Sequence, residues 1–166
     1  MFQRLSLLLL SAATLAAVSC KKSPETAIYS GTNLPLNAAQ VVPTPATPST
    51  ATGSINASYD NGTRTLSYTV TWANTMDSVT SIRVYGPAEA GFNTPGSVAT
   101  QTFSNSVTAQ TVPPRRKSGT FSQTLAVDNT VVKESELLAG LYYIQVFTKT
   151  SSSVPELRGQ ILLNRQ

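Results

Sequence analysis

The segment of residues 137–163 decides the fold class, and it reads LLAGLYYIQVFTKTSSSVPELRGQILL. Two parts rich in aromatic and branched residues flank a polar, Ser-rich connection at residues 149–154. This pattern is typical of two antiparallel strands joined by an exposed loop, because aromatic and β-branched side chains suit a half-buried pleated surface. We therefore expect the most strand-like part of the molecule here.

Alternation of polar and apolar residues predicts further strands before this segment. Residues 65–72 alternate large apolar side chains with Ser or Thr, which is the clearest period-2 pattern in the chain. Residues 53–59 form the expected hairpin partner, and residues 60–63 (DNGT) should supply the positive φ angles of the turn. The other expected strands are residues 34–42, 79–85, 98–103 and 119–127.

A single helical pattern occurs at residues 130–140. Asn129 or Thr130 is the candidate N-cap, acidic residues follow early, and Gly140 is a candidate C-terminal stop. The sequence therefore predicts one helix of about two turns, which would cross between sheets.

The composition of the whole chain favours the same all-β class. Its 166 residues are 40% hydrophobic and only 12% charged, and the turn-forming residues are plentiful, as in a β-domain with many loops. A chain of this length buries the core of one domain without disulfide bonds. The net charge of +4 is too small to indicate a nucleic-acid partner.

The residue types needed for catalysis are scarce. Histidine is absent, which removes the commonest general base and the commonest transition-metal ligand. The hydroxyls lack a Gly-x-Ser-x-Gly elbow, the carboxylates show no spacing for acid–base work, and P-loop and dinucleotide motifs are missing. We therefore predict no catalytic residues, no cofactor, no bound metal and no enzymatic activity.

The N-terminus carries the signals of an exported protein. Residues 1–19 have Arg4, an apolar stretch and small residues before Cys20, which is typical of a secretory leader rather than a membrane span. The sequence Ala17-Val18-Ser19-Cys20 resembles the lipobox of bacterial lipoproteins. That resemblance implies that Cys20 is the lipidated first residue of the mature protein. An ordinary leader that leaves a free cysteine is the alternative.

The lipobox also suggests where the protein resides. Acyl chains on Cys20 would supply stable attachment to a bilayer. Position 21 is Lys rather than Asp, and in similar lipoproteins the absence of Asp there favours transfer to the outer membrane. Residues 20–33 are polar and form an expected tether, with the folded domain at residues 34–166. The expected location is the bacterial cell envelope, with the membrane face left open.

Taken in order, several segments resemble the CHRD domain, a module named from chordin and also found in bacterial envelope proteins. The resemblance spans about residues 36–163, and residues 156–161 (ELRGQI) are its most specific match. It implies an immunoglobulin-like or superoxide-dismutase-like antiparallel β-sandwich, with Greek-key topology, about seven or eight strands and one short crossover helix. The other matching segments are LNAAQVVP at 36–43, the hairpin at 53–72, IRVYGP at 82–87, SGTF at 118–121 and LLAGLYYIQVFT at 137–148.

The resemblance also locates a candidate site. Typical members carry His-x-His-Gly-Pro in the middle motif and Asn-Val-His-Thr in the late one, and imidazoles so placed could hold a metal. The matching positions here are Arg83, Tyr85 and Phe147, so the metal role is not carried over. An arginine stacked on aromatic rings would instead form a small recognition patch, and structural filling is the alternative.

Two further sets of residues are candidates. Residues Glu156, Arg158, Gly159 and Gln160 are an expected structural motif, in which Arg158 points inward and is held by a carboxylate and backbone carbonyls, while Gly159 allows a close backbone approach. Ligand recognition by Glu156 and Arg158 is the alternative. The basic run Arg115, Arg116 and Lys117 would either contact acidic polysaccharide or lipid headgroups, or form a solvated loop.

These observations predict a lipid-anchored, non-enzymatic module that binds a protein or a glycan, since binding sites on such sandwiches usually lie in loops. A structural or assembly scaffold of the envelope is the alternative. A metal or redox protein related to the dismutase-like fold is a third hypothesis, which the missing histidines disfavour.

Overall fold

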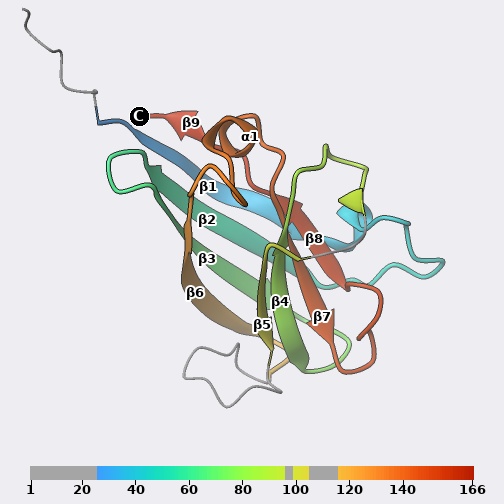
Figure 1. The fold of residues 1–166 in the computed structure, drawn as a ribbon. Helices are drawn as coiled ribbons and strands as arrows, with labels where there is room; N and C mark the ends of the chain where they lie inside the picture. Colours follow the sequence, from blue (N-terminus) through green and yellow to red (C-terminus); the bar gives the residue numbers. More distant parts are fainter. Residues whose placement is uncertain (1–25, 96–98, 105–115) are drawn as a thin grey trace, which may run out of the picture.

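A computed structural model describes residues 26–95, 99–104 and 116–166 of the chain (Figure 1). The described residues form one curled antiparallel sheet with strand order β5-β4-β7-β8-β1-β2-β3-β6, and β9 pairs with β1. The strands are β1 Ile28–Asn37, β2 Thr52–Asp60, β3 Thr65–Ala73, β4 Val79–Tyr85, β5 Gln101–Ser104, β6 Gly119–Ala126, β7 Tyr143–Thr148, β8 Leu157–Gln160 and β9 Asn164–Arg165. The helical elements are the 3-10 turn η1 Ala38–Gln40 and α1 Glu134–Leu138.

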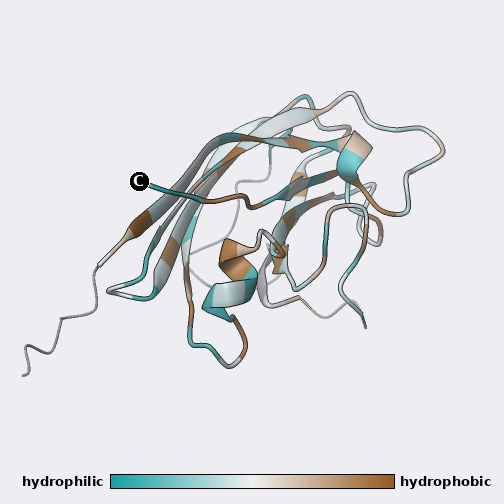
Figure 2. Cartoon of the chain, turned by 90° about the horizontal axis from the view of Figure 1, so that it is seen from above, coloured by the Kyte–Doolittle hydropathy of each residue, from teal (hydrophilic) through white to brown (hydrophobic). Residues whose placement is uncertain are grey.

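The expected all-β sandwich is confirmed. The sheet curls so that its two halves share a single core, and α1 lies over one end of it (Figures 1 and 2). Ile55 and Val70 come from one half of the sheet, Ile82 and Val146 from the other, and all are completely buried. No helix among the described residues is long and apolar enough to cross a membrane.

The strand pair predicted from residues 137–163 is present as β7 and β8. The two strands are antiparallel, with Tyr143 opposite Gln160 and Val146 opposite Leu157. The hairpin of β2 and β3 is also confirmed, with Tyr59 opposite Leu66. Its apolar residues are buried because the alternating pattern directs them into the core.

The turn of this hairpin differs from the prediction. Neither Asn61 nor Gly62 has a positive φ; Arg64 does, at 52°. The Asp60 carboxylate accepts a hydrogen bond of 2.8 Å from the backbone N–H of Gly62. The loop is therefore a longer one, shaped by an aspartate turn and closed by a left-handed residue, rather than a two-residue turn.

The boundary predicted between tether and domain was also wrong. Strand β1 begins at Ile28, so residues 28–33 belong to the sheet. Their polar side chains suggested a tether, but Ser30 and Thr32 lie on the outer face of a strand that pairs with β2. Backbone pairing does not depend on side-chain polarity. Residues 20–25, and Cys20 with them, lie outside the described residues.

The helix is shorter than expected, at Glu134–Leu138. Lys133 occupies its N-cap without a side-chain hydrogen bond, yet the Asn129 amide oxygen accepts a bond of 2.8 Å from the N–H of Glu134. Gly140 ends the helix with a φ of 73°. Gly140 thus serves as predicted, whereas the predicted N-cap at Asn129 or Thr130 was wrong, although the Asn129 side chain binds the first N–H of the helix.

Loops bury the outer face of strand β7, whereas the outer face of β3 is more exposed. Every residue of β7 is buried, whereas β3 alternates between buried and more exposed residues. One face of β7 contributes Ile144 and Val146 to the core. Its opposite face is covered by loops, and this covered face carries the candidate site.

Candidate functional site

The face of β4, β7 and β8 that points away from the core is polar and aromatic. Arg83 pairs with Gln145, which pairs with Arg158; Tyr85 pairs with Tyr143, which pairs with Gln160. Cross-strand partners project from the same face of a sheet. We call this surface the loop-covered face, and its residues are Arg83, Tyr85, Tyr143, Gln145, Phe147, Arg158 and Gln160.

The structure brings the three predicted patch residues together. The guanidinium carbon of Arg83 lies 4.1 Å from the centroid of the Phe147 ring, within the range of a cation–π contact. Its Nη1 donates a long hydrogen bond of 3.4 Å to the Tyr85 hydroxyl. The Nε of Arg83 is buried and has no hydrogen-bond partner in the structure.

Tyr143 links this patch to the ELRGQI segment, a connection that sequence reasoning missed. Its ring stacks on Tyr85 with centroids 5.6 Å apart and planes 14° apart, and the guanidinium carbon of Arg158 lies 4.0 Å from the Tyr143 centroid. Tyr143 precedes Phe147 by an even number of residues in the same strand. That spacing was the available signal that both side chains share a face.

Arg158 is buried and held by backbone carbonyls, as expected, but no carboxylate pairs with it. Nη1 donates to the carbonyl of Gln40 at 3.1 Å, and Nη2 donates to the carbonyl of Phe92 at 2.8 Å. A further contact joins Nη2 to the Gln160 amide oxygen at 3.3 Å. Burial lowers the pKa of the Arg158 guanidinium, which nonetheless stays protonated as arginine does in proteins.

Glu156 does not pair with Arg158, which corrects the prediction that a carboxylate holds the arginine. Its buried carboxylate accepts hydrogen bonds from Ser49 Oγ and the Met76 N–H at 2.7 Å, and from Thr148 Oγ1 at 2.8 Å. Glu156 directly precedes β8, and its carboxylate binds Ser49 and the Met76 N–H, whereas Arg158 binds the carbonyls of Gln40 and Phe92.

Gly159 and Gln160 complete the segment. A Cβ on Gly159 would lie 2.6 Å from the Pro35 carbonyl oxygen, so glycine permits the close approach of β8 to β1. The Gln160 amide donates to the carbonyls of Ala88 at 2.9 Å and Gly140 at 2.6 Å. The ELRGQI segment therefore fastens the loops that cover this face.

A cavity of about 270 Å³ opens over Arg83, and we call it the Arg83 pocket. Its floor is the sheet, including Tyr85, Gln145 and Phe147, and loops form its walls. The wall residues are Val42, Pro43, Asn93, Ser153, Val154 and Pro155. A guanidinium, an amide and a hydroxyl thus face a space bounded by apolar groups, which suits binding of a small polar ligand group.

A model of the CHRD domain matches residues 32–161. The chain belongs to the CHRD domain family. Membership indicates a β-sandwich binding module of a generally non-enzymatic family. Searches of curated proteins and of solved structures returned no match for this chain. The matched residues include the whole loop-covered face of this CHRD domain.

The donor set of this CHRD domain does not suit a transition metal. A guanidinium, a phenol and a phenyl ring stand at positions 83, 85 and 147, and the sequence contains no histidine. Among the described residues, no group of three His, Cys, Asp or Glu side chains could hold a metal ion. The arrangement can bind an anion through the guanidinium, but positions 83, 85 and 147 offer no imidazole, thiolate or carboxylate.

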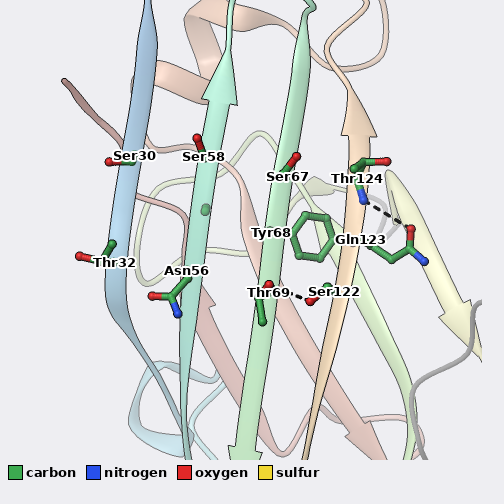
Figure 3. A pocket seen from close by; sticks show the side chains of 11 residues that line it. Ser30, Thr32, Asn56, Ser58, Ser67, Tyr68, Thr69, Ser122, Gln123 and Thr124 are labelled. Carbon is green, nitrogen blue, oxygen red and sulfur yellow. Dashed lines mark hydrogen bonds between the residues drawn. The ribbon is translucent and has the colours of Figure 1, made fainter.

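A second, broader depression of about 570 Å³ lies on the outer face of β1, β2, β3 and β6. Figure 3 shows Ser30, Ser58, Ser67 and Thr124 side by side across these strands. The Oγ1 of Thr69 and the Oγ of Ser122 are hydrogen bonded at 2.8 Å. None of the residues lining this depression is charged. The smaller Arg83 pocket contains a guanidinium, so it can bind a charged ligand group more strongly.

The other predicted residues lie elsewhere. Arg116 and Lys117 are exposed, and neither lines the Arg83 pocket. The carbonyl of Arg116 accepts a hydrogen bond of 3.1 Å from the Trp72 indole, which is buried in the core. Arg115 and Cys20 lie outside the described residues.

Proposed function

We propose that this protein is a lipid-anchored component of the bacterial envelope whose CHRD domain binds a protein or glycan partner without catalysing a reaction. Family membership supports a binding module. The lipobox-like sequence ending at Cys20 supports the anchor. The two features together describe a module held at a membrane surface with its loops free to contact a partner.

The Arg83 pocket is the observation that carries this proposal. Its half-buried guanidinium is stacked on Phe147, and the only ion pair among the described residues joins Lys133 to Glu136, elsewhere in the fold. Removing a charged group from water without a counter-charge is costly. A ligand that brings hydrogen-bond acceptors to Arg83 would offset that cost, which makes the pocket suited to binding.

The same face is poorly equipped for acid–base catalysis. The residues of the loop-covered face include no carboxylate, and the nearby buried Glu156 accepts hydrogen bonds from two hydroxyls and one backbone N–H. A carboxylate so occupied is a weak candidate for a general base. Turnover of an ester, phosphate or glycan by the purified protein, abolished by one substitution in the pocket, would contradict the non-enzymatic function.

Capture of a partner from envelope extract tests the binding function. The wild-type chain should retain a partner in a saturable manner, and the Arg83→Met variant should retain much less because it lacks the guanidinium. Lys149→Met, which removes an exposed charge outside the pocket, is the matched control. A wild-type chain that retains no saturable partner would contradict the proposal and favour the scaffold hypothesis.

Anchoring is tested separately in a bacterial host that processes lipoproteins. The wild-type chain should incorporate labelled palmitate and sediment with outer membranes, whereas Cys20→Ser should do neither. Protease treatment of intact cells then distinguishes a surface-facing from a periplasmic domain. Labelling of Cys20→Ser equal to the wild type would rule out this cysteine as the anchor.

A further inference from the structure

We propose that the Arg83 pocket binds the carboxylate of a uronic acid residue within an acidic polysaccharide. This inference rests on the proposed binding function and names the ligand class of the same site.

None of the acidic side chains in the described part of the chain pairs with Arg83. Glu25 is the only acidic residue outside the described part of the chain, and the ion pair of Lys133 and Glu136 is the only one within that part. Arg158 shows the contrast, because backbone carbonyls occupy both of its terminal nitrogens. Arg83 has only the long contact to the Tyr85 hydroxyl. An anion is therefore the complementary ligand.

The stacking of Arg83 determines how that anion can approach. Phe147 covers one face of the guanidinium at 4.1 Å, and the N–H donors of a guanidinium all point outward in its plane. A planar carboxylate can therefore meet the edge of Arg83 through two parallel hydrogen bonds, which is the geometry that arginine favours.

The rest of the pocket favours a sugar over an acidic peptide. The cavity of about 270 Å³ extends beyond Arg83 to Asn93, Gln145 and Ser153. Asn93 donates its amide N–H to the carbonyl of Val42 at 2.6 Å, which leaves its amide oxygen to accept a hydroxyl. Ring hydroxyls of a uronate would use these groups, whereas an aspartate or glutamate side chain would use only Arg83.

Apolar walls add to the same preference. Val42, Pro43, Val154 and Pro155 border the cavity, and Val154 is 44% exposed. The C–H groups of a pyranose ring can pack on such surfaces while its hydroxyls reach the amides. A pocket with a few convergent polar groups set among apolar ones is the usual form of a small-ligand site.

Calorimetry on the full chain in detergent tests this inference with three probes: a galacturonate trisaccharide, a neutral galactose trisaccharide and a glutamate hexapeptide. The wild type should bind the uronate at least tenfold more tightly than either alternative. Arg83→Met should lose about tenfold or more in uronate affinity, and Lys149→Met, at an exposed position outside the pocket, should lose none. Arg83→Lys keeps the charge without the planar edge, and it should weaken binding several-fold.

Each other outcome overturns the inference. Equal binding of the neutral sugar, unchanged uronate affinity in Arg83→Met, or no binding of any probe would exclude a uronate site. Tighter binding of the acidic peptide would reject the sugar class but leave the proposed binding function intact. That function fails only if the wild-type chain captures no partner from envelope extract. If Arg83→Met does not fold, Arg83→Lys decides the result.

Discussion

The guanidinium of Arg158 lies 4.0 Å from the centroid of the Tyr143 ring, which also stacks on Tyr85. This contact joins the ELRGQI segment to the Arg83 pocket. Arg158 positions the floor of the pocket and at the same time binds the carbonyls of the loops around residues 40 and 92. Stability of the domain and shape of the pocket therefore depend on the same side chain.

Replacing Arg158 by methionine should destabilise the domain by about 3 kcal/mol, because buried carbonyls lose their donors. Urea denaturation should show a lower midpoint with an unchanged slope. Hydrogen exchange should rise in the loop that contains Phe92. Lys149→Met, at an exposed position, is the control, and a midpoint for Arg158→Met equal to the wild type would refute this role.

Glu156→Gln should lower the free energy of unfolding by about 1.5–3 kcal/mol, since hydrogen bonds to a charged group are stronger than those to a neutral amide. The amide would also direct an N–H group at one of the present donors, Ser49, Thr148 or the Met76 N–H. Chemical denaturation against Glu89→Gln, an exposed carboxylate, measures the difference. Equal stability of the two variants would show that Glu156 is dispensable.

Gly159→Ala tests the close approach of β8 to β1. The new Cβ would meet the Pro35 carbonyl oxygen at 2.6 Å, and backbone cannot move aside as a flexible side chain can. Overpacking of this kind typically costs about 1–3 kcal/mol. In thermal unfolding, the melting temperature should fall clearly for Gly159→Ala. It should hardly change for Ala39→Ser, at an exposed site. Similar melting temperatures would contradict the proposed contact.

Alkaline pH should destabilise the protein through its buried tyrosines. Burial, aided by the negative charge of Glu134, raises the pKa of Tyr59 to about 12, and burial raises the pKa of Tyr68. An unfolded tyrosine ionises near 10, so the unfolded state loses its protons first. This contribution to stability is complete below pH 10 and is lost as pH rises towards about 12.

Urea denaturation at several pH values, followed with tyrosinate absorbance, checks this dependence. Tyr59→Phe should reduce the slope of stability against alkaline pH, and it should cost little at neutral pH because the Tyr59 hydroxyl has no hydrogen-bond partner in the structure. Stability that is constant from pH 8 to 11.5 would contradict the raised pKa values.

Much of the fold followed from local patterns. Alternation in residues 65–72 located β3 and its buried face, and the composition of residues 137–163 located β7 and β8. Such patterns are reliable because a strand directs successive side chains to opposite faces. The same reasoning failed for β1, whose outer residues are polar, and for the turn at Arg64, where the Asp60 carboxylate shapes the loop by accepting a hydrogen bond from the Gly62 N–H.

The sequence by itself determined the strand faces, the absence of histidine at the family positions and the shared face of Arg83 and Tyr85, and only the family resemblance added Phe147 to them. Only the tertiary structure decided that Tyr143 joins them to Arg158, and that Glu156 serves other loops instead of the arginine. The physical reason is that alternation fixes the direction of a side chain within its own strand. Its neighbours depend on which strands pair and on which loops cover the face, and those contacts join residues far apart in the chain.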